Sequence, residues 1–390
     1  MTLPPHLACI VEAEYPRFSD AEMARRRAAI ETLLAQTEAD HLVFCGANRF
    51  GSVVQWLTQW PVTAEAVGVL TPGKRRDALF VQYVNHAPQA RILAGKADVA
   101  WGGESSIAAA IKVLEQRGAR QDRVATIGPI SAEQHAALLA KFGKSKNLNR
   151  EYIRLRQVKS ADELDWLRIG AHFSDVGMAA LRDGLKPGLN ERELGDLVER
   201  AYIPHGATNI IHYIGVTAMN APDLGVPRQF PRMRRVQAGD AVVAEISAAF
   251  WNYPGQVLRS FALGASNALY RELHAAADAA FDAIAAVLKA GARPAQVIEA
   301  SGVIEEAGFT IIDDLLHGYG GGYLPPILGC KSRPSGPVPQ EPFRAGQTVV
   351  IQPNIVTRDG KAGVQTGEMV VITETGIERL HSMPRGFAQL

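Results

Sequence analysis

Short hydrophobic runs recur along the first 150 residues and alternate with stretches of helical periodicity. The runs lie at 41–45, 67–70, 78–84 and 124–128. Each run is long enough for one buried strand, whereas 105–118 repeats its apolar positions at helical spacing. This pattern predicts a small α/β domain built around one sheet.

The pattern changes near residue 155, where two helix starts follow each other. Ser160 with Glu163, and Asn190 with Glu193, have the spacing of capping boxes. Beyond them we expect strands at 209–216 and 241–250, helices at about 266–290 and 295–307, and strands near 347–356 and 368–373. Helices that alternate with hairpins indicate an α+β architecture. We therefore expect two domains, 1–155 and 156–390.

The charge balance excludes several classes of partner. Lys and Arg number 41 and Asp and Glu 40, so no field of one sign attracts nucleic acid or an anionic membrane. A small, neutral or zwitterionic substrate fits this balance better. The three cysteines lack the spacing of a disulfide framework or a zinc knuckle. Because neither a signal peptide nor a long apolar run is present, we expect a cytoplasmic protein.

Glu245 is the first candidate for catalysis. Val243, Glu245 and Ser247 alternate along a predicted strand, so the Glu245 carboxyl should face a pocket. A carboxylate among apolar residues has a raised pKa and can act as a general base or nucleophile near neutral pH. The alternative is a buried ion pair with Arg228 or Arg259.

His317 and Arg228 are further candidates. His317 follows two leucines and precedes a glycine-rich turn, which places its ring at the mouth of a pocket as a proton donor. A core histidine without function is the alternative. Arg228 can grip a substrate carboxylate with its planar guanidinium. It can equally be a solvated member of the basic run that continues to Arg235.

Five segments, in order, resemble the pita-bread family of aminopeptidase P, prolidase and creatinase. They are RLRQVKSADEL, VPRQFPRMRRVQAGDAVVAEI, the turn at Tyr253–Arg259, LHGYGGGYLPP, and FRAGQTVVIQPNIV with GVQTGEMVVITETG. The resemblance covers essentially the whole chain. It implies a C-terminal pita-bread fold preceded by a smaller, creatinase-type α/β domain, and a homodimer. Three tryptophans of the N-terminal domain are candidates for the dimer interface, namely Trp56, Trp60 and Trp101.

The resemblance also locates the positions of the family's metal ligands. They fall on Glu245, Gln256, His317, Gln352 and Gly367, and only the histidine is of the family's type. Hard divalent cations need several anionic oxygens, and three of these positions carry no charge. We therefore expect no metal and no other cofactor.

The predicted substrate-binding residues share positions that the family places around its pocket. They are Arg228, Gln256, Gln352, Tyr253, His212 and Glu368. The two glutamines would orient substrate or water through their amides. Tyr253 would offer its hydroxyl, although an aromatic residue in a hairpin more often serves packing.

Together these observations lead to a first hypothesis, a metal-independent hydrolase of the creatinase or ectoine hydrolase type. It would cleave a C–N bond in a small polar nitrogen compound, with Glu245 as base or nucleophile and His317 protonating the leaving group. A lyase using the same two residues is the nearest variant. A metallo-aminopeptidase of the Xaa-Pro type with degenerate ligands and a non-catalytic binding protein remain as alternatives.

Overall fold

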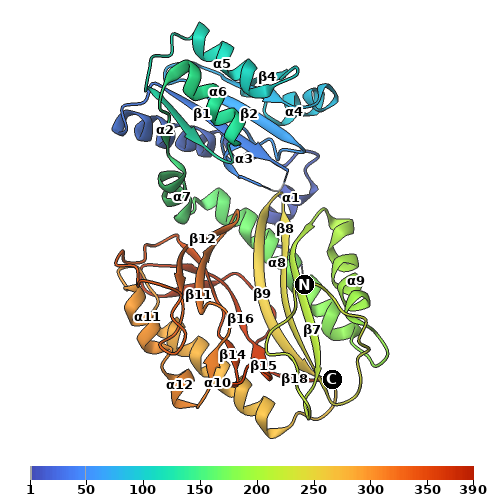
Figure 1. Cartoon of the computed structure of the whole chain (residues 1–390). Coiled ribbons are helices and arrows are strands. Elements are labelled where there is room, and N and C mark those ends of the chain that lie inside the picture. The colour runs from blue at the N-terminus through green and yellow to red at the C-terminus, as the bar shows by residue number, and fades with distance from the viewer. Residues whose placement is uncertain (1, 49) are drawn as a thin grey trace. The chain divides into compact units, whose positions relative to one another are not determined.

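The computed structural model describes residues 2–48 and 50–390, which fold into two compact units (Figure 1). One unit is Ala13–Arg156, and the other joins the segment that ends at Glu12 to Gln157–Leu390. The domain boundary that we propose near residue 155 falls within helix α7 (Asn149–Gln157). Each unit is described separately below.

The N-terminal unit is built on a six-stranded mixed sheet with the strand order β4-β3-β2-β1-β5-β6. Its strands are β1 (His41–Ala47), β2 (Glu65–Leu70), β3 (Asp77–Val81), β4 (Ala97–Trp101), β5 (Val124–Ile127) and β6 (Lys146–Asn147). Its other helices are α2 (Asp20–Gln36), α3 (Val53–Thr58), α4 (Ala87–Leu93), α5 (Ser106–Gln116) and α6 (Ala132–Phe142). The four strands and the helix predicted from hydrophobic runs are thereby confirmed, and the α/β character of this domain with them.

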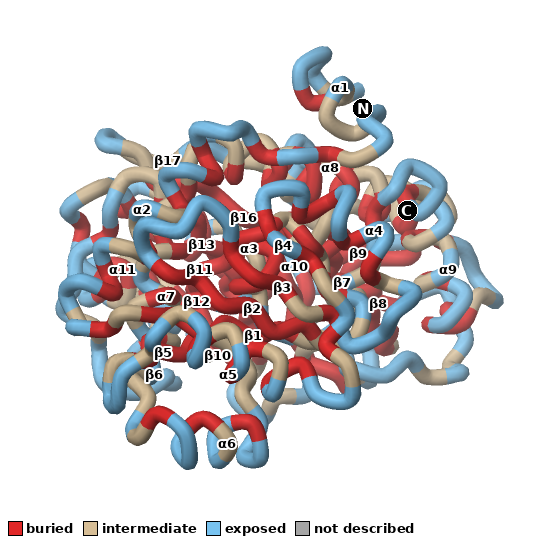
Figure 2. Tube along the Cα trace, turned by 90° about the horizontal axis from the view of Figure 1, so that it is seen from above, coloured by how far each residue is buried: buried red, intermediate tan, exposed pale blue. Residues whose placement is uncertain are grey.

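One core of this unit forms between its sheet and helix α5. Val43, Val67 and Val69 pack against Ile107 and Leu114, and Figure 2 shows β1 and β2 as buried. Burial on both sides explains why these strands are apolar at nearly every position.

The tryptophans of the N-terminal unit differ in how far their side chains are exposed to solvent. Trp56 and Trp60 are only 3% and 2% exposed, because both side chains are part of the core. The prediction that they contribute to an interface is therefore wrong. Trp101 is 51% exposed at the end of β4 and remains available.

The C-terminal unit contains a nine-stranded and a three-stranded sheet. The larger runs β12-β11-β13-β16-β9-β8-β7, with β17 beside β16 and β18 beside β9, and the smaller runs β10-β14-β15. The strands are β7 (Thr208–Ala218), β8 (Asp240–Phe250), β9 (Tyr253–Ala262), β10 (Thr310–Ile311), β11 (Leu316–Tyr319), β12 (Tyr323–Leu328), β13 (Thr348–Ile351), β14 (Asn354–Val356), β15 (Gly363–Gln365), β16 (Gly367–Ile372), β17 (Ile377–Arg379) and β18 (Ala388–Gln389). Short connections of the described chain join the two sheets at 312–315, at Gln352–Pro353 and at Thr366.

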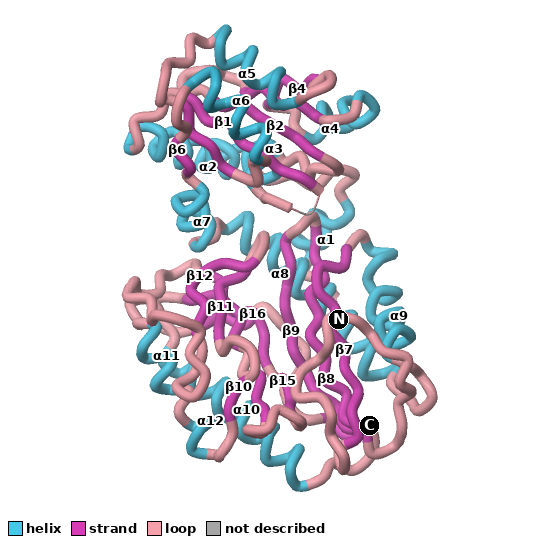
Figure 3. Tube along the Cα trace, in the orientation of Figure 1, coloured by secondary structure: helices cyan, strands magenta, loops and turns pink. Residues whose placement is uncertain are grey.

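Helices cover these sheets from outside, as Figure 3 shows for α8 and α9 beside the long strands β7, β8 and β9. They are α1 (Pro5–Glu12), α8 (Ala161–Gly184), α9 (Glu191–Tyr202), α10 (Ala268–Val287), α11 (Pro294–Ala300) and α12 (Val303–Glu306). Both predicted capping boxes form, at the starts of α8 and α9. Within the described residues, no helix has both the length and the apolar character to cross a bilayer.

Helix α8 lies unusually close to the hairpin of β8 and β9. A Cβ atom added at Gly255 would lie 2.2 Å from Cα of Ala171, and one added at Gly170 would lie 2.3 Å from O of Tyr253. Ser174 Oγ accepts a 2.8 Å hydrogen bond from the backbone of Ala248. Because no side chain separates helix and hairpin here, the position of the hairpin is fixed from behind.

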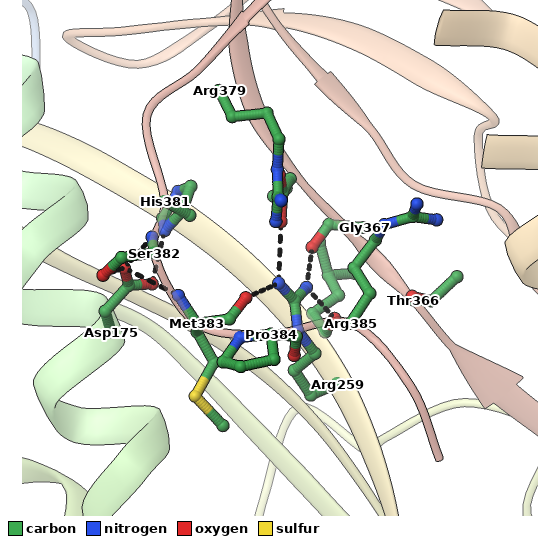
Figure 4. Close-up of polar contacts among 12 residues, drawn as sticks. Asp175, Arg259, Thr366, Gly367, Arg379, His381, Ser382, Met383, Pro384 and Arg385 are labelled. Atoms are coloured by element: carbon green, nitrogen blue, oxygen red, sulfur yellow. Dashed lines mark hydrogen bonds and ion pairs between the residues drawn. The ribbon is translucent and has the colours of Figure 1, made fainter. Parts of the chain in front are cut away.

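The C-terminal segment fixes the other end of β9 through Arg259 (Figure 4). The Arg259 guanidinium is buried and donates to Pro384 O at 2.8 Å and to Gly367 O at 2.7 Å. It also forms a 2.7 Å ion pair with Glu368. Arg259 therefore ties β9 to β16 and to the C-terminal segment, and its ion pair is with Glu368.

Candidate active site

Strand register places a set of polar side chains on the face of the sheet opposite α8 and α9. Glu245 pairs with Tyr213 of β7, and Ser247 pairs with Gln256 of β9. Residues directly opposite each other in a sheet, and residues two apart on one strand, share a face. Glu245, Ser247, Gln256 and Tyr213 therefore lie on one face of the hairpin.

The side chains of Glu245, Gln256, Gln352 and His317 meet in one buried network. Gln256 Nε2 donates to Glu245 Oε1 at 2.7 Å and to Gln352 Oε1 at 3.3 Å. His317 Nε2 lies 3.3 Å from the same Gln352 oxygen. All four are at most 7% exposed. Four residues that the sequence assigned to one site are thus in contact, from strands β8, β9 and β11 and from the bend after β13.

Two further residues join this network, and the sequence interpretation missed both. The Gln352 amide donates to Oδ1 of Asp314, and Gln365 Nε2 donates to Glu245 Oε2 at 3.3 Å. Asp314 is 5% exposed and Gln365 1%. An acidic pair directly before the Leu-Leu-His run was a signal for Asp314. We found no comparable signal for Gln365, whose role depends on the second sheet lying beside β8.

Burial controls the protonation of the two acids. Burial, aided by the negative charge of nearby Asp313 and opposed by hydrogen bonds from Gln365 and Gln256, raises the pKa of Glu245 to about 7. Burial and the charge of Asp313 likewise raise the pKa of Asp314 to about 8. At neutral pH both carboxyl groups can therefore exchange a proton.

His317 is neutral under the same conditions. Burial lowers its pKa to about 4, because the charged ring is poorly solvated. Nδ1 lies 3.0 Å from Gly318 O, and the ring stacks on Tyr323 with centroids 3.9 Å apart. Nε2 faces Gln352 Oε1, so both ring nitrogens meet oxygen acceptors, whereas a neutral ring has only one N–H to donate. The neutral ring therefore donates one hydrogen bond within the network and carries no second proton for a leaving group.

Several polar atoms of this network have no hydrogen-bond partner among the described residues. They are Oε1 of Gln256, Oδ2 of Asp314 and Oε1 of Gln365. Buried polar atoms are almost always hydrogen-bonded to protein or water. Three such atoms in one network indicate where a polar ligand or a reacting water can bind.

Three of the predicted substrate-binding residues lie on the other face of the sheet. His212 pairs with Ile246, Tyr253 is three residues from Gln256 on the same strand, and Glu368 pairs with Val257. Because side chains alternate between the two faces of a strand, the side chains of these three residues lie on the face that the helices cover. The structure therefore separates these three side chains from the network around Glu245.

Their contacts agree with this placement. His212 Nε2 lies 2.5 Å from the hydroxyl of Tyr202 on α9. The hydroxyl of Tyr253 donates to Glu163 on α8 at 3.3 Å. The carboxylate of Glu368 is held by Arg259, so its place beside Gly367 does not bring it into the network.

Arg228 also lies apart from Glu245. Its side chain is 46% exposed and its guanidinium is 3.9 Å from Asp223. It lines a pocket of about 620 Å³ together with His212 and residues of α9, such as Glu199 and Arg200. Nothing in this geometry brings the guanidinium to a ligand that is bound at Glu245.

Comparison with known proteins places the chain in a family. Residues 165–374 match the model of metallopeptidase family M24. The chain belongs to this family. It is 24% identical to an Xaa-Pro dipeptidase of Pyrococcus furiosus over 59% of its own length and 65% of that protein. It is 26% identical to the probable dipeptidase PepE of Mycobacterium tuberculosis, over 59% and 60% of the two chains.

The fold of this M24 member is that of the solved peptidases. The X-Pro aminopeptidase of Thermotoga maritima superposes with a TM-score of 0.80 at 17% identity, over 93% of this chain and 99% of that one. This likeness confirms the pita-bread fold with its preceding α/β domain. It does not support a creatinase-like or lyase assignment. The prediction of a non-peptidase C–N hydrolase is wrong, because the family and the relatives are peptidases by name.

The donor set of this M24 member does not fit the metal that the family name implies. Among the described residues there is no group of three or more His, Cys, Asp or Glu side chains that could hold a metal ion. Glu245 and Asp314 each receive an amide hydrogen bond from a glutamine, and Gly367 has no side chain. Amide N–H groups and a missing carboxylate do not make a site for a hard dication.

Proposed function

We propose that this M24 member hydrolyses short peptides, with dipeptides of the Xaa-Pro type as the first substrate class to test. The match to the metallopeptidase family over residues 165–374 carries the proposal. The relatives named as dipeptidases support this size of substrate. The near-neutral charge of the chain suits a small zwitterionic substrate.

The network around Glu245 supplies groups for this reaction. With a pKa of about 7, the Glu245 carboxylate can remove a proton from a water that attacks the peptide carbonyl. The C–N bond then breaks, and the same proton passes from Glu245 to the amine that leaves. One amide hydrogen of Gln365 Nε2 is donated to Glu245. The second hydrogen on the same nitrogen can donate to the carbonyl oxygen of the substrate while the water attacks.

The test is release of free amino acids from a panel of dipeptides with and without proline at the second position. Each dipeptide is assayed after chelation and again with added Mn²⁺, Co²⁺ or Zn²⁺, because the family is one of metallopeptidases. We expect turnover of at least one peptide class, and its loss in Glu245→Gln. A panel on which no peptide is cleaved under any of these conditions would contradict the proposal.

We further propose a cytoplasmic homodimer. Trp101 is the tryptophan of the N-terminal unit that is exposed enough to join an interface. Light scattering should give about twice the chain mass of 42.1 kDa, and Trp101→Glu should shift the protein toward monomer. A strict monomer of the unaltered chain at micromolar concentration would rule the dimer out.

A further inference from the structure

We propose that Gln256 and Gln352, at two of the positions that the resemblance gives to metal ligands, link Glu245 to Asp314 in one hydrogen-bonded chain that excludes divalent cations. The inference concerns cation binding alone. Its test therefore stands whether or not short peptides prove to be the substrate.

The first support is the direction of the hydrogen bonds. Gln256 Nε2 donates to Glu245 Oε1 at 2.7 Å and to Gln352 Oε1 at 3.3 Å, and the Gln352 amide donates to Asp314 Oδ1. A cation binds through the lone pairs of oxygen atoms, and these N–H groups, together with the Gln365 amide, donate to both oxygens of Glu245 and to one oxygen of Asp314. A dication would also meet the positive ends of the amide dipoles. The two amides thus donate hydrogen bonds to the two carboxyl groups, which cations would otherwise bind, and they add no charge to the network.

The second support is steric and comes from Gly367. A Cβ atom built there would lie 2.3 Å from Ile351 O and 2.9 Å from Cα of Gln352. Real Cβ atoms essentially never approach other atoms below 3.0 Å, so any side chain at this position forces the backbone to move. Gly367 is therefore not an open position that has merely lost a ligand. Backbone of the bend after β13 fills the space that a carboxylate would need.

Gly367 is held in this position by Arg259. The Arg259 guanidinium donates a 2.7 Å hydrogen bond to Gly367 O, which Figure 4 shows, and forms an ion pair with Glu368. The Arg259 side chain is 1% exposed. Because Arg259 also holds the C-terminal segment, a shift of Gly367 away from Ile351 would break several buried contacts.

The network also has too few anionic oxygens to bind two divalent cations. Two carboxyl groups and one imidazole remain in the network, because the other two family ligand positions beside them carry amides and Gly367 has no side chain. Two dications bring four positive charges, which this set does not offset.

The test is a titration of the chelated, dialysed protein with Mn²⁺, Co²⁺ and Zn²⁺ at pH 7.5, followed by calorimetry and by elemental analysis. We expect less than about 0.2 equivalents of any cation on the unaltered chain. One or more equivalents bound with micromolar affinity would overturn the proposal, whatever the activity of the protein.

The double variant Gln256→Asp/Gln352→Glu isolates the contribution of the amides. It restores two carboxylates, so we expect it to bind about one equivalent, and not two, because Gly367 still supplies no ligand. Gln340→Glu is the matched control, since it adds a carboxylate at an exposed position outside the network and should bind no more than the unaltered chain. Circular dichroism establishes that each variant is folded. A folded double variant that binds no cation would overturn the role given to the amides.

Discussion

Gln256 Nε2 lies 2.7 Å from Oε1 of Glu245, so the two strands of the hairpin are joined at the centre of the site by an amide–carboxyl hydrogen bond. In a metallopeptidase frame these two positions would both carry carboxylates. An amide beside the acid removes one charge and supplies a donor. Glu245 thereby remains, with Asp314, one of the two carboxyl groups of the network whose proton can move.

The role of Glu245 is tested by Glu245→Gln. The amide keeps the volume of the side chain but cannot accept a proton near pH 7, so peptide turnover should fall by about 10²–10⁴-fold. The free energy of unfolding should fall by about 0.5–1.5 kcal/mol, because the new amide can accept only one of the two hydrogen bonds that Gln256 and Gln365 donate to Glu245. Tyr253→Phe is the control, since its hydroxyl contacts α8 on the other face. Full turnover in Glu245→Gln would remove this residue from the mechanism.

The pH dependence of kcat/KM should follow the ionisation of the Glu245 carboxyl group. Its pKa is raised to about 7, so the base is protonated below that value and kcat/KM should fall about tenfold per pH unit on the acid side. The charge of Asp313 contributes to this shift, and Asp313 is exposed. Asp313→Asn should therefore move the midpoint to lower pH. A profile that is flat between pH 5 and 8, roughly the range around such a base, would contradict the assignment.

Asp175 should stabilise the chain in a pH-dependent way. It accepts 2.8 Å and 2.9 Å hydrogen bonds from His381 Nδ1 and Ser382 Oγ, which Figure 4 shows at the C-terminal segment. Burial alone would raise the pKa of Asp175, but the interactions with His381 and Ser382 bring it below the ordinary value. A depressed pKa contributes stability that is present above the unfolded value and is lost as pH falls through the folded one.

The variant Asp175→Asn should consequently lower the free energy of unfolding by about 1.5–3 kcal/mol at pH 7, the range for hydrogen bonds to a charged group. Its stability should also depend less on pH in the acid range. Urea unfolding at several pH values measures both effects. Equal acid sensitivity of the variant and the unaltered chain would show that Asp175 does not carry the effect.

Gly255 should tolerate no side chain. A Cβ atom there would lie 2.2 Å from Cα of Ala171, so Gly255→Ala should cost about 1–3 kcal/mol or more by pushing α8 from the hairpin. Gly195→Ala on α9 is the matched control. Its Cβ would meet nothing within 4 Å, and alanine should stabilise that helix by about 0.5–1 kcal/mol. Thermal melting of the two variants should therefore shift in opposite directions.

The sequence by itself determined most of the elements and part of the site. Apolar runs located four strands of the N-terminal sheet, and serine and asparagine caps located the starts of α8 and α9, because these signals are local. The resemblance of five segments to one family then brought Glu245, Gln256, Gln352 and His317 into one site. The structure places these four side chains in contact.

Only the tertiary structure decided what else belongs to that site and how it is charged. Asp314 and Gln352 are 38 residues apart in the chain, and their contact requires the bend after β13 to lie against the start of β11. The faces of His212 and Glu368 depend on which residue each one meets across the sheet. The raised pKa of Glu245 and the lowered pKa of His317 arise from burial, which no local pattern specifies. Periodicity reports the neighbours of a residue along one strand, whereas register and burial depend on chain segments that are distant in sequence.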